Sequence, residues 1–586
     1  MCLNRAVPVR APPQSSPNNC SDAKRRLFSS GVLLLCQAQG RISGLPTAVP
    51  IAAAGCIAAC GMLGQPSAAD RTKGECARKA GFVVEAAFRF WRQEDWPAAY
   101  RILCNRATLA GSGRIAKLLQ MKNEKPELKR ALKNRHVQLI ALGGAIGTGL
   151  FLGSAGTIQM AGPAVLISYA LGGFIAFMIM RQLGEMMAQE PVAGSFSNLA
   201  HKYWGDFPGL LSGWNYWILY VLVGMSELSA VAVYVQYWFP SIQPWQTTAF
   251  FFLLITGVNL CHVSLFGEME FWFASIKIVA IVSMILLGSF LLFSGHAGPD
   301  AAVSNLWTHG GFLPHGWEGV FTALAVVAFS FGGLELVGIA AAETDNPRVT
   351  IPKAVNQIIY RILIFYIGAL LVLLTLHPWS QLGAPVDKSH WAQAMVASPF
   401  VQIFDLIGIP FAAHVLNFVV LTAALSVYNG CVYCNSRMLF GLALQGNAPK
   451  AFGTVSARGV PVYALLISSL ATLICVIINY AMPGKALGLL MSLVVAALVI
   501  NWAMISLTHL KFRAAMVRAG EVIHFKSLWH PFTNYLCLLV MAMVLAVLVI
   551  IGESLAVMLA PIWIAFVWLG YKLKKQSKHL PPSMSK

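Results

Sequence analysis

Residues Leu142 to Leu152 read LGGAIGTGLFL, with four glycines and a threonine inside an apolar segment of helical length. A glycine in a helix interior costs about 1 kcal/mol relative to alanine and exposes backbone groups that hydrocarbon cannot satisfy. Two interpretations are open. Gly143 and Gly147 have the spacing of small residues at which membrane helices pack closely. Alternatively, the helix is interrupted here and its freed backbone groups bind a ligand.

A second interruption occurs at Phe329 to Glu335, which reads FSFGGLE. The two stretches lie in the first and the sixth of the apolar segments of the chain. Interrupted helices at corresponding places indicate an inverted-repeat transporter whose site lies between the repeats. N–H groups at the start of one half-helix favour a carboxylate, and carbonyls at the end of the other favour an ammonium. An amino-acid zwitterion offers both charges, so the pattern predicts an amino acid transporter.

The composition is that of an integral membrane protein. Apolar residues make up 57% of the 586 residues and charged residues only 11%, too few to cover the surface of a soluble protein. The formal net charge is +19, but after residue 120 the excess of Lys and Arg lies almost wholly in short loops. This distribution is a topology signal, so the expected partner is a lipid bilayer and not nucleic acid.

From about His136 the chain is a succession of apolar segments near the roughly 20 residues that cross a bilayer. We predict an all-α fold with twelve transmembrane helices, near residues 138–158, 163–183, 209–234, 247–266, 271–294, 317–340, 357–377, 401–430, 461–481, 486–509, 531–551 and 554–572. Lys and Arg gather in alternate loops, and the loop at 295–316 on the opposite side has none. The positive-inside rule therefore places both termini in the cytoplasm.

The first 120 residues differ from the rest, with Pro and Ser clusters and no sustained periodicity. Thr47 to Leu63 contains Pro and Gly and is only a weak candidate for a span or a signal-peptide core. We expect residues 1–120 to be a disordered extension or an upstream segment that is not translated. In the second case translation starts at Met121, before the polar leader of the first helix, and residues 121–586 form the transport domain.

Three ionisable residues lie deep in predicted spans: Glu227 in the third, Lys277 in the fifth and Glu335 in the sixth. Each costs several kcal/mol unless it is paired or hydrated, so each is a functional candidate. A buried lysine can release and regain a proton, which makes proton coupling a hypothesis. Structural alternatives are open: Lys277 as a permanently charged tether to carbonyls of the first helix, and Glu227 as a hydrogen bond between helices.

Other chemistry finds little support in the sequence. Cys431 and Cys434 have the spacing of a redox or zinc pair, but no second pair is nearby, and two buried thiols explain them better. No phosphate-binding loop, nucleotide fingerprint, Ser/His/Asp arrangement or metal-ligand spacing occurs. We therefore expect no enzyme activity, metal, cofactor or obligatory protein partner, and a proton gradient as the driving force.

Residues Glu127 to Tyr571 resemble the bacterial aromatic amino acid permeases of the amino acid-polyamine-organocation superfamily. The resemblance lies in strings such as LKNRHVQLIALGGAIGTGLFLGSA, SGWNYWILYVLV, FGEMEFWFASIK, FSFGGLELVGIAAAETDNP and VVLTAALSVYNGCVYCNSRMLFGLALQGNAPKA. It implies a LeuT-like fold, a five-plus-five inverted repeat with two further helices and with helices 1 and 6 discontinuous. It also implies proton symport of phenylalanine, tyrosine and tryptophan into the cell across the bacterial inner membrane.

The resemblance also implies roles for individual residues. The substrate carboxylate would bind the first-helix motif, comprising Ile146, Gly147, Thr148 and Gly149. The ammonium would bind the sixth-helix motif, which also supplies an aromatic gate and comprises Phe329, Ser330, Phe331, Gly332 and Gly333. Lys277 would occupy the place of a sodium ion, as in sodium-independent relatives, and Glu335 would act in gating or coupling.

Several related functions stay open at the level of sequence. The pocket could be narrowed to phenylalanine or widened to other neutral amino acids, because one methylene changes binding by only about 1–3 kcal/mol. A membrane amino acid sensor on the same scaffold is a third possibility, although the basic end at Lys572 to Lys586 is short for a signalling tail.

Overall fold

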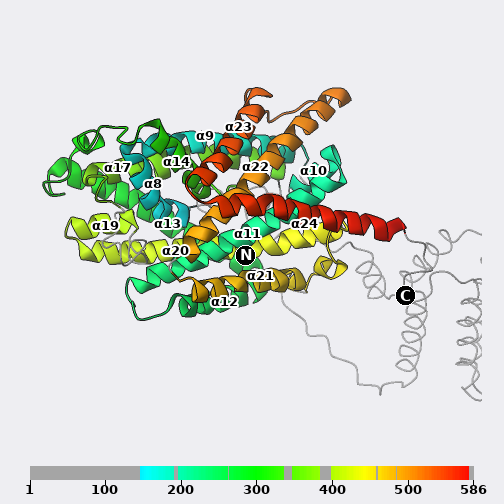
Figure 1. The fold of residues 1–586 in the computed structure, drawn as a ribbon, viewed down its shortest axis with the longest axis horizontal. Coiled ribbons are helices and arrows are strands. Elements are labelled where there is room, and N and C mark those ends of the chain that lie inside the picture. Colours follow the sequence, from blue (N-terminus) through cyan, green and yellow to red (C-terminus); the bar gives the residue numbers. More distant parts are fainter. Residues whose placement is uncertain are drawn as a thin grey trace, which may run out of the picture. The chain divides into compact units, whose positions relative to one another are not determined.

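A computed structural model of the chain describes residues 146–190, 196–261, 263–335, 346–382, 398–456, 459–483 and 485–579. Within these residues every regular element is a helix and no strand occurs, as Figure 1 shows. The all-helical class is therefore confirmed for the described part of the chain. The predictions for residues 1–120 and for Met121 lie outside the described residues.

Each of the twelve predicted segments contains all or part of a helix. In chain order the α-helices are α7 (Thr148–Phe151), α8 (Gly153–Ala161), α9 (Val165–Gln189), α10 (Phe196–Trp204), α11 (Asp206–Gln236), α12 (Pro244–Cys261), α13 (Val263–Ser294), α14 (Gly316–Ser330), α16 (Pro347–Arg361), α17 (Ala369–Leu376), α19 (Pro399–Leu406), α20 (Pro410–Leu444), α21 (Val462–Ala481), α22 (Ala486–Ala519), α23 (Phe532–Ile550) and α24 (Ser554–His579). The other helical segments are η1 (Gly162–Ala164), η2 (Val303–Leu306), η4 (Lys450–Gly453) and the π-helical η3 (Ile362–Gly368) between α16 and α17.

Nine helices among the described residues are long and apolar enough to cross a membrane, judged by length and composition. One of them, Gly153–Gln189, runs through α8, η1 and α9. The sixth predicted segment gives a shorter apolar helix, Gly316–Ser330, and the first begins in residues outside the description. The chain is thus a multi-pass membrane protein, while the count of twelve spans stays a prediction.

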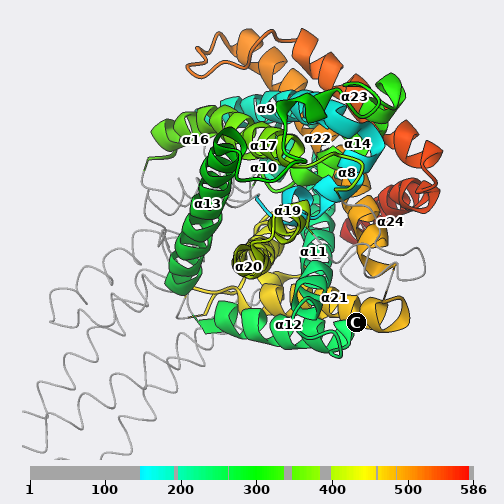
Figure 2. The same ribbon diagram turned by 90° about the vertical axis from the view of Figure 1, so that its left-hand side faces the viewer.

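Helices α11 and α20 form the middle of the bundle. They pack against each other, and α11 also packs against α22. Figures 1 and 2 show this pair between a layer that contains α9, α22 and α23 and a layer that contains α12 and α21. In α11, 78% of the most apolar 18-residue window is buried inside the protein. A helix that is apolar on all sides and surrounded by others belongs to the core.

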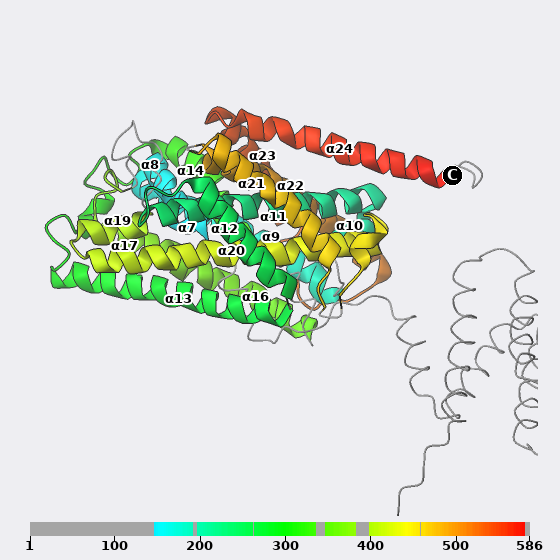
Figure 3. The same ribbon diagram turned by 90° about the horizontal axis from the view of Figure 1, so that it is seen from below.

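Helix α24 lies at the edge of the bundle, as seen in Figure 3. Only 11% of its most apolar window is buried, and large side chains such as Ile562 and Phe566 are exposed. These side chains would contact lipid in the bilayer, because hydrocarbon accepts an apolar surface that water would not. Apolar periodicity alone could not separate α24 from α11.

A buried charged cluster connects α9 to α22. The side chain of Glu185 is fully buried and accepts a hydrogen bond of 2.9 Å from Nη2 of Arg513. His509 Nε2 lies 3.1 Å from the same carboxylate, and the backbone amide of Ser527 donates to it. A buried carboxylate needs such partners, so the cluster holds α9, α22 and the segment after α22 in one arrangement.

Candidate functional site

The first-helix motif lies at the start of α7. Gly147 has an extended backbone, with φ −140° and ψ −151°, and the helix begins at the next residue, Thr148. The first amides of a helix have no carbonyl partner within that helix, and the dipole is positive at this end. The amides of Thr148 and Gly149 therefore form the kind of start that attracts a carboxylate. The residues before Ile146 lie outside the description.

The glycines of this motif allow three other helices to approach. A Cβ atom at Gly149 would lie 2.5 Å from the Cα atom of Ser330 in α14. A Cβ atom at Gly147 would lie 2.8 Å from Oε1 of Glu227 in α11 and 2.8 Å from Cγ2 of Val427 in α20. Such distances are shorter than real Cβ contacts, so a side chain at Gly149 would displace the backbone of α14, and one at Gly147 would displace the side chains of Glu227 and Val427. Close packing and ligand binding, which the sequence left as alternatives, are compatible at this point.

A small cavity lies where these helices meet. Its lining consists of Gly147, Gly149, Val223, Glu227, Phe329, Ser330, Gly332 and Val427. The cavity has a volume of about 10 Å³, which is space for about one water molecule. Beside it, the Thr148 hydroxyl and Oε2 of Glu227 are buried, and neither makes a hydrogen bond of good geometry within the described part of the chain, although the two groups lie close enough to interact with each other. Buried polar atoms normally have partners, so these two are candidates for ligand contacts.

The sixth-helix motif ends α14. The helix ends at Ser330. Two hydrogen bonds between residues three apart follow, from Phe331 N to Ala328 O and from Gly332 N to Phe329 O, both 3.1 Å. Gly333 has φ +93°, a left-handed conformation that glycine adopts without strain. The chain therefore turns here, and residues 336–345 beyond it lie outside the description.

The residues of this motif divide between two surroundings. Phe329, Ser330 and Gly332 line the cavity. Phe331 does not line it. Its ring is fully buried and forms a cluster with the rings of Tyr169 and Tyr366, at centroid distances of 6.0 and 4.9 Å.

Glu335 lies away from the cavity. Its carboxylate accepts a hydrogen bond of 3.0 Å from the amide of Gly333 and another from the indole N–H of Trp502 in α22. Glu335 is thus placed to hold the turn after α14 against α22. This position suits a role in gating more than direct contact with a ligand in the cavity.

Hydroxyl groups from neighbouring helices hold the end of α14. Tyr366 in η3 donates 2.9 Å to the carbonyl of Ser330, and Tyr169 lies 3.2 Å from the Ser330 hydroxyl. Arg361, which is 1% exposed, donates 3.2 Å to the Tyr366 hydroxyl. The last carbonyls of a helix need partners of this kind. Arg361 lies inside the predicted seventh span, 357–377, but it was not among the ionisable residues predicted to be functional.

Lys277 reaches the first-helix motif from α13. Its Nζ atom donates 3.1 Å to the carbonyl of Ile146 and 3.0 Å to the Ser426 hydroxyl of α20. The bond to Ile146 is the contact that the tether alternative expects. Glu270 lies on the same helix and is 1% exposed. It was not among the predicted functional residues, because the predicted fifth span begins one residue later.

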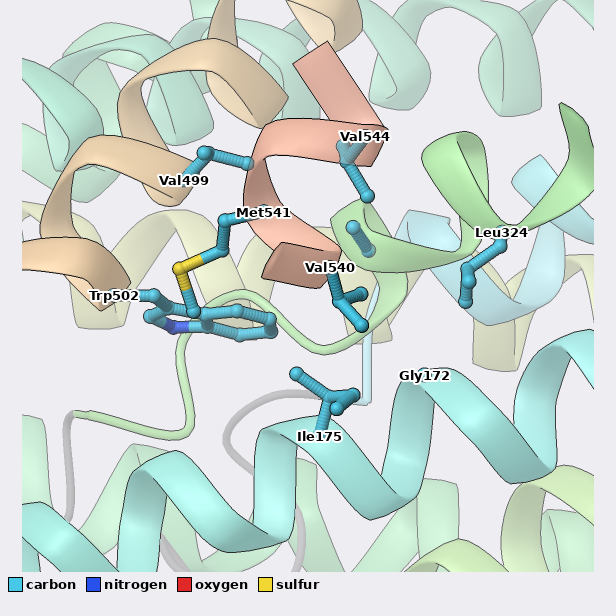
Figure 4. A pocket seen from close by; sticks show the side chains of 9 residues that line it. Gly172, Ile175, Leu324, Val499, Trp502, Val540, Met541 and Val544 are labelled. Carbon is cyan, nitrogen blue, oxygen red and sulfur yellow. The ribbon is translucent and has the colours of Figure 1, made fainter. Parts of the chain in front are cut away.

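The six residues Gly147, Gly149, Glu227, Phe329, Ser330 and Gly332 are thus brought together around one cavity. A second cavity, about 20 Å³ in volume, is lined by α9, α14, α22 and α23, and Figure 4 shows its apolar side chains. An apolar cavity of this size stays dry, so it offers no polar contact to a zwitterion. Among the described residues, no group of three or more His, Cys, Asp or Glu side chains is placed to hold a metal ion.

Comparisons with known proteins show the family of this chain. The family model for amino acid permeases matches residues 136–580. The chain is 60% identical over 452 residues to the aromatic amino acid transport protein AroP of Escherichia coli (strain K12), an alignment that covers 77% of this chain and 96% of that protein. AroP of Salmonella typhimurium (strain LT2) gives the same values. The amino acid permease YtnA of Bacillus subtilis (strain 168) is 42% identical over 455 residues, covering 77% of this chain and 96% of YtnA.

Proposed function

The chain belongs to the amino acid permease family, and on that basis we propose that it imports aromatic amino acids across the bacterial inner membrane by proton symport. The observation that carries the substrate class is the 60% identity, over 96% of their length, to transporters named for aromatic amino acids. The proposal includes a LeuT-like arrangement of twelve helices in two inverted repeats, discontinuous at helices 1 and 6, with both termini in the cytoplasm.

The backbone around the cavity supports binding of a zwitterion. The carboxylate of the substrate binds the amides at the start of α7 and the Thr148 hydroxyl. The ammonium binds carbonyls at the end of α14 and faces the Glu227 carboxylate. The carboxylate and the ammonium of the substrate both meet dipoles and charges that are already in place, so the protein needs little reorganisation on binding.

The aromatic side chain of the substrate requires more room than the cavity of about 10 Å³ provides. Phe329 lines the cavity and is 6% exposed, so a change in its side-chain torsions is the simplest way to enlarge the space. We assign Phe329 to contact with the substrate ring. Phe331, packed against two tyrosines, moves with the turn after α14 and serves the gate.

The test is uptake of labelled phenylalanine by purified protein in proteoliposomes, with and without an imposed pH gradient that is alkaline inside. We expect accumulation that depends on the gradient and that excess tyrosine or tryptophan abolishes. Competition by leucine as strong as by tryptophan would indicate a broader neutral amino acid permease, and no competition by tyrosine or tryptophan a phenylalanine-selective one. Uptake that ignores the pH gradient would refute symport. Preference for lysine would refute the substrate class, and binding without any transport would indicate a sensor.

A further inference from the structure

Glu270 and Lys277 form a second buried unit beside the substrate site. They lie seven residues apart on α13, so they share one face of the helix two turns apart. Glu270 is 1% exposed and Lys277 is fully buried. Between them lies Ser426 of α20, whose hydroxyl is 3.0 Å from Nζ of Lys277 and 2.8 Å from each carboxylate oxygen of Glu270.

The three groups have one direction of hydrogen bonding. A lysine ammonium only donates and an ionised carboxylate only accepts, while a hydroxyl has one proton to donate. Lys277 therefore donates to Ser426, and Ser426 donates to Glu270. Lys277 also donates 3.1 Å to the carbonyl of Ile146, the residue before Gly147. The unit thus extends from the carboxylate of Glu270 to the first-helix motif.

Charged groups on other described helices also lie near this unit. Glu227 of α11 and Arg361 of α16 both lie within electrostatic reach of Lys277. Cys431 of α20 lies within reach of Glu227 and Glu270. With the two carboxylates, the lysine and the arginine ionised, the formal charges cancel. An isolated charge at this depth costs several kcal/mol of free energy. Moving a proton within the unit therefore costs less than removing the proton from it, because no unpaired charge is left behind.

We propose that Glu270 and Lys277 hold the transported proton jointly, with the Ser426 hydroxyl passing it between them; this rests on the proposed proton symport. In the step, one N–H bond of Lys277 breaks as its proton bonds to Ser426 Oγ. The original Ser426 proton bonds to Glu270 at the same time. An ammonium and carboxylate pair becomes an amine and carboxylic acid pair, and no net charge is created.

The proton position then changes the substrate site. A charged donor makes a stronger hydrogen bond than a neutral one, by about a factor of two. When the proton is on Glu270, the neutral amine of Lys277 holds the Ile146 carbonyl less firmly. The start of α7 becomes freer to move relative to α13, which links protonation of Glu270 to the contacts made by Gly147 and Thr148.

The experiment uses full-length protein in proteoliposomes that contain a pH-sensitive dye. Two measurements are made: phenylalanine-dependent proton influx, and exchange of external labelled for internal unlabelled phenylalanine. The variants are Glu270→Gln and Ser426→Ala. The matched control is Ser275→Ala on α13, whose hydroxyl donates 2.8 Å to the Phe271 carbonyl of its own helix.

We expect both test variants to keep exchange within about threefold of wild type, because the substrate contacts remain, and to lose at least tenfold of the proton influx. Their exchange becomes independent of external pH between 5 and 8, a result that a purely structural role for Glu270 would not produce. Ser275→Ala keeps both activities and the pH dependence of wild type.

Wild-type proton influx in Glu270→Gln would overturn the shared proton and leave symport standing. If Glu270→Gln does not fold, Ser426→Ala decides, since it removes only the hydroxyl and keeps both charges. Loss of exchange together with influx in both variants would assign the unit to positioning of the first helix, and would also overturn the proposal. No phenylalanine-dependent influx in wild type would refute symport and the shared proton together.

Discussion

Replacing Gly149 with alanine would test the contact between the first-helix motif and α14. The added Cβ atom would lie 2.5 Å from the Cα atom of Ser330 and 3.0 Å from its backbone nitrogen. These are backbone atoms of a helix, so they cannot move aside as the end of a flexible side chain can. To reach 3.4 Å, where ordinary contact begins, the two helices must separate by about 0.9 Å at this point.

The size of the effect follows from the cost of overpacking. Adding a methyl group to a packed interior costs about 1–3 kcal/mol, and each 1.4 kcal/mol is a tenfold change. The arrangement that brings Gly149 next to Ser330 would become about 5 to 150 times less populated relative to separated helices. The apparent affinity for phenylalanine falls by the same factor if only the packed arrangement binds it.

Exchange of labelled phenylalanine in proteoliposomes over a range of concentrations measures this affinity. The matched control is Gly156→Ala, on α8 of the same interrupted helix, where a Cβ atom would have nothing within 4 Å. We expect at least a fivefold loss of apparent affinity in Gly149→Ala and none in Gly156→Ala. Equal amounts of monodisperse protein in detergent would show that folding is not the cause.

Wild-type affinity and wild-type uptake by Gly149→Ala would refute the reasoning. The first-helix motif and α14 would then not need to meet for binding, and the cavity between them would not be the substrate site. A loss of the same size in Gly156→Ala would show that helix flexibility matters, and not the close approach.

Three further predictions concern contacts outside the cavity. Glu185→Gln removes a buried carboxylate from its charged partners, so we expect a loss of about 3–5 kcal/mol in stability, measured as a lower Tm in detergent, with exchange retained by the folded fraction. Trp502→Phe removes the N–H donor to Glu335, and we expect a loss of about 1–3 kcal/mol, seen as slower net uptake with unchanged exchange affinity. The hydrogen bond to Glu190 raises the pKa of Lys202, so their ion pair stabilises the fold fully below the ordinary value of 10.5 and loses this contribution as the pH rises through the raised value. Because the pair is exposed, Lys202→Ala should cost under about 1 kcal/mol at pH 7, measured by the shift in Tm.

Each of these predictions has a result that contradicts it. A Glu185→Gln protein as stable as wild type would show that the cluster does not fix α9. A change in exchange affinity in Trp502→Phe would place Glu335 closer to substrate binding than the geometry indicates. A destabilisation by Lys202→Ala that grows between pH 7 and pH 11 would reverse the sign expected from the raised pKa.

Much of the fold was predictable from sequence, because hydrocarbon tolerates few structures. A segment that lies in hydrocarbon has no water to bond, so its backbone N–H and C=O groups must hydrogen-bond to each other. An apolar run of sufficient length is therefore a helix. For the same reason the glycines at Gly147 and Gly332 were conspicuous, and both line the cavity. Lys277 and Glu227 were identified because a charge is rare at such depth.

Other site residues were missed for a physical reason. Hydropathy favours span boundaries that exclude ionisable residues, so Glu270 fell one residue before the predicted fifth span. Arg361 fell near the start of the predicted seventh span, where a charge can reach the membrane surface and draws no attention. Both are 1% exposed in the structure. They are tolerated there because partners on other helices satisfy them: Ser426 bonds Glu270, and Tyr366 accepts from Arg361.

The sequence by itself determined that this protein lies in a membrane and where its described helices lie, since these depend on local chemistry; it also predicted two places where a helix is interrupted. Only the tertiary structure decided which groups face each other. It turned Phe329 toward the cavity and Phe331 into an aromatic cluster, although they are two residues apart. It also placed Ser426 between Glu270 and Lys277. Such pairings depend on the packing of helices distant in sequence, and no periodicity along one helix specifies its partner.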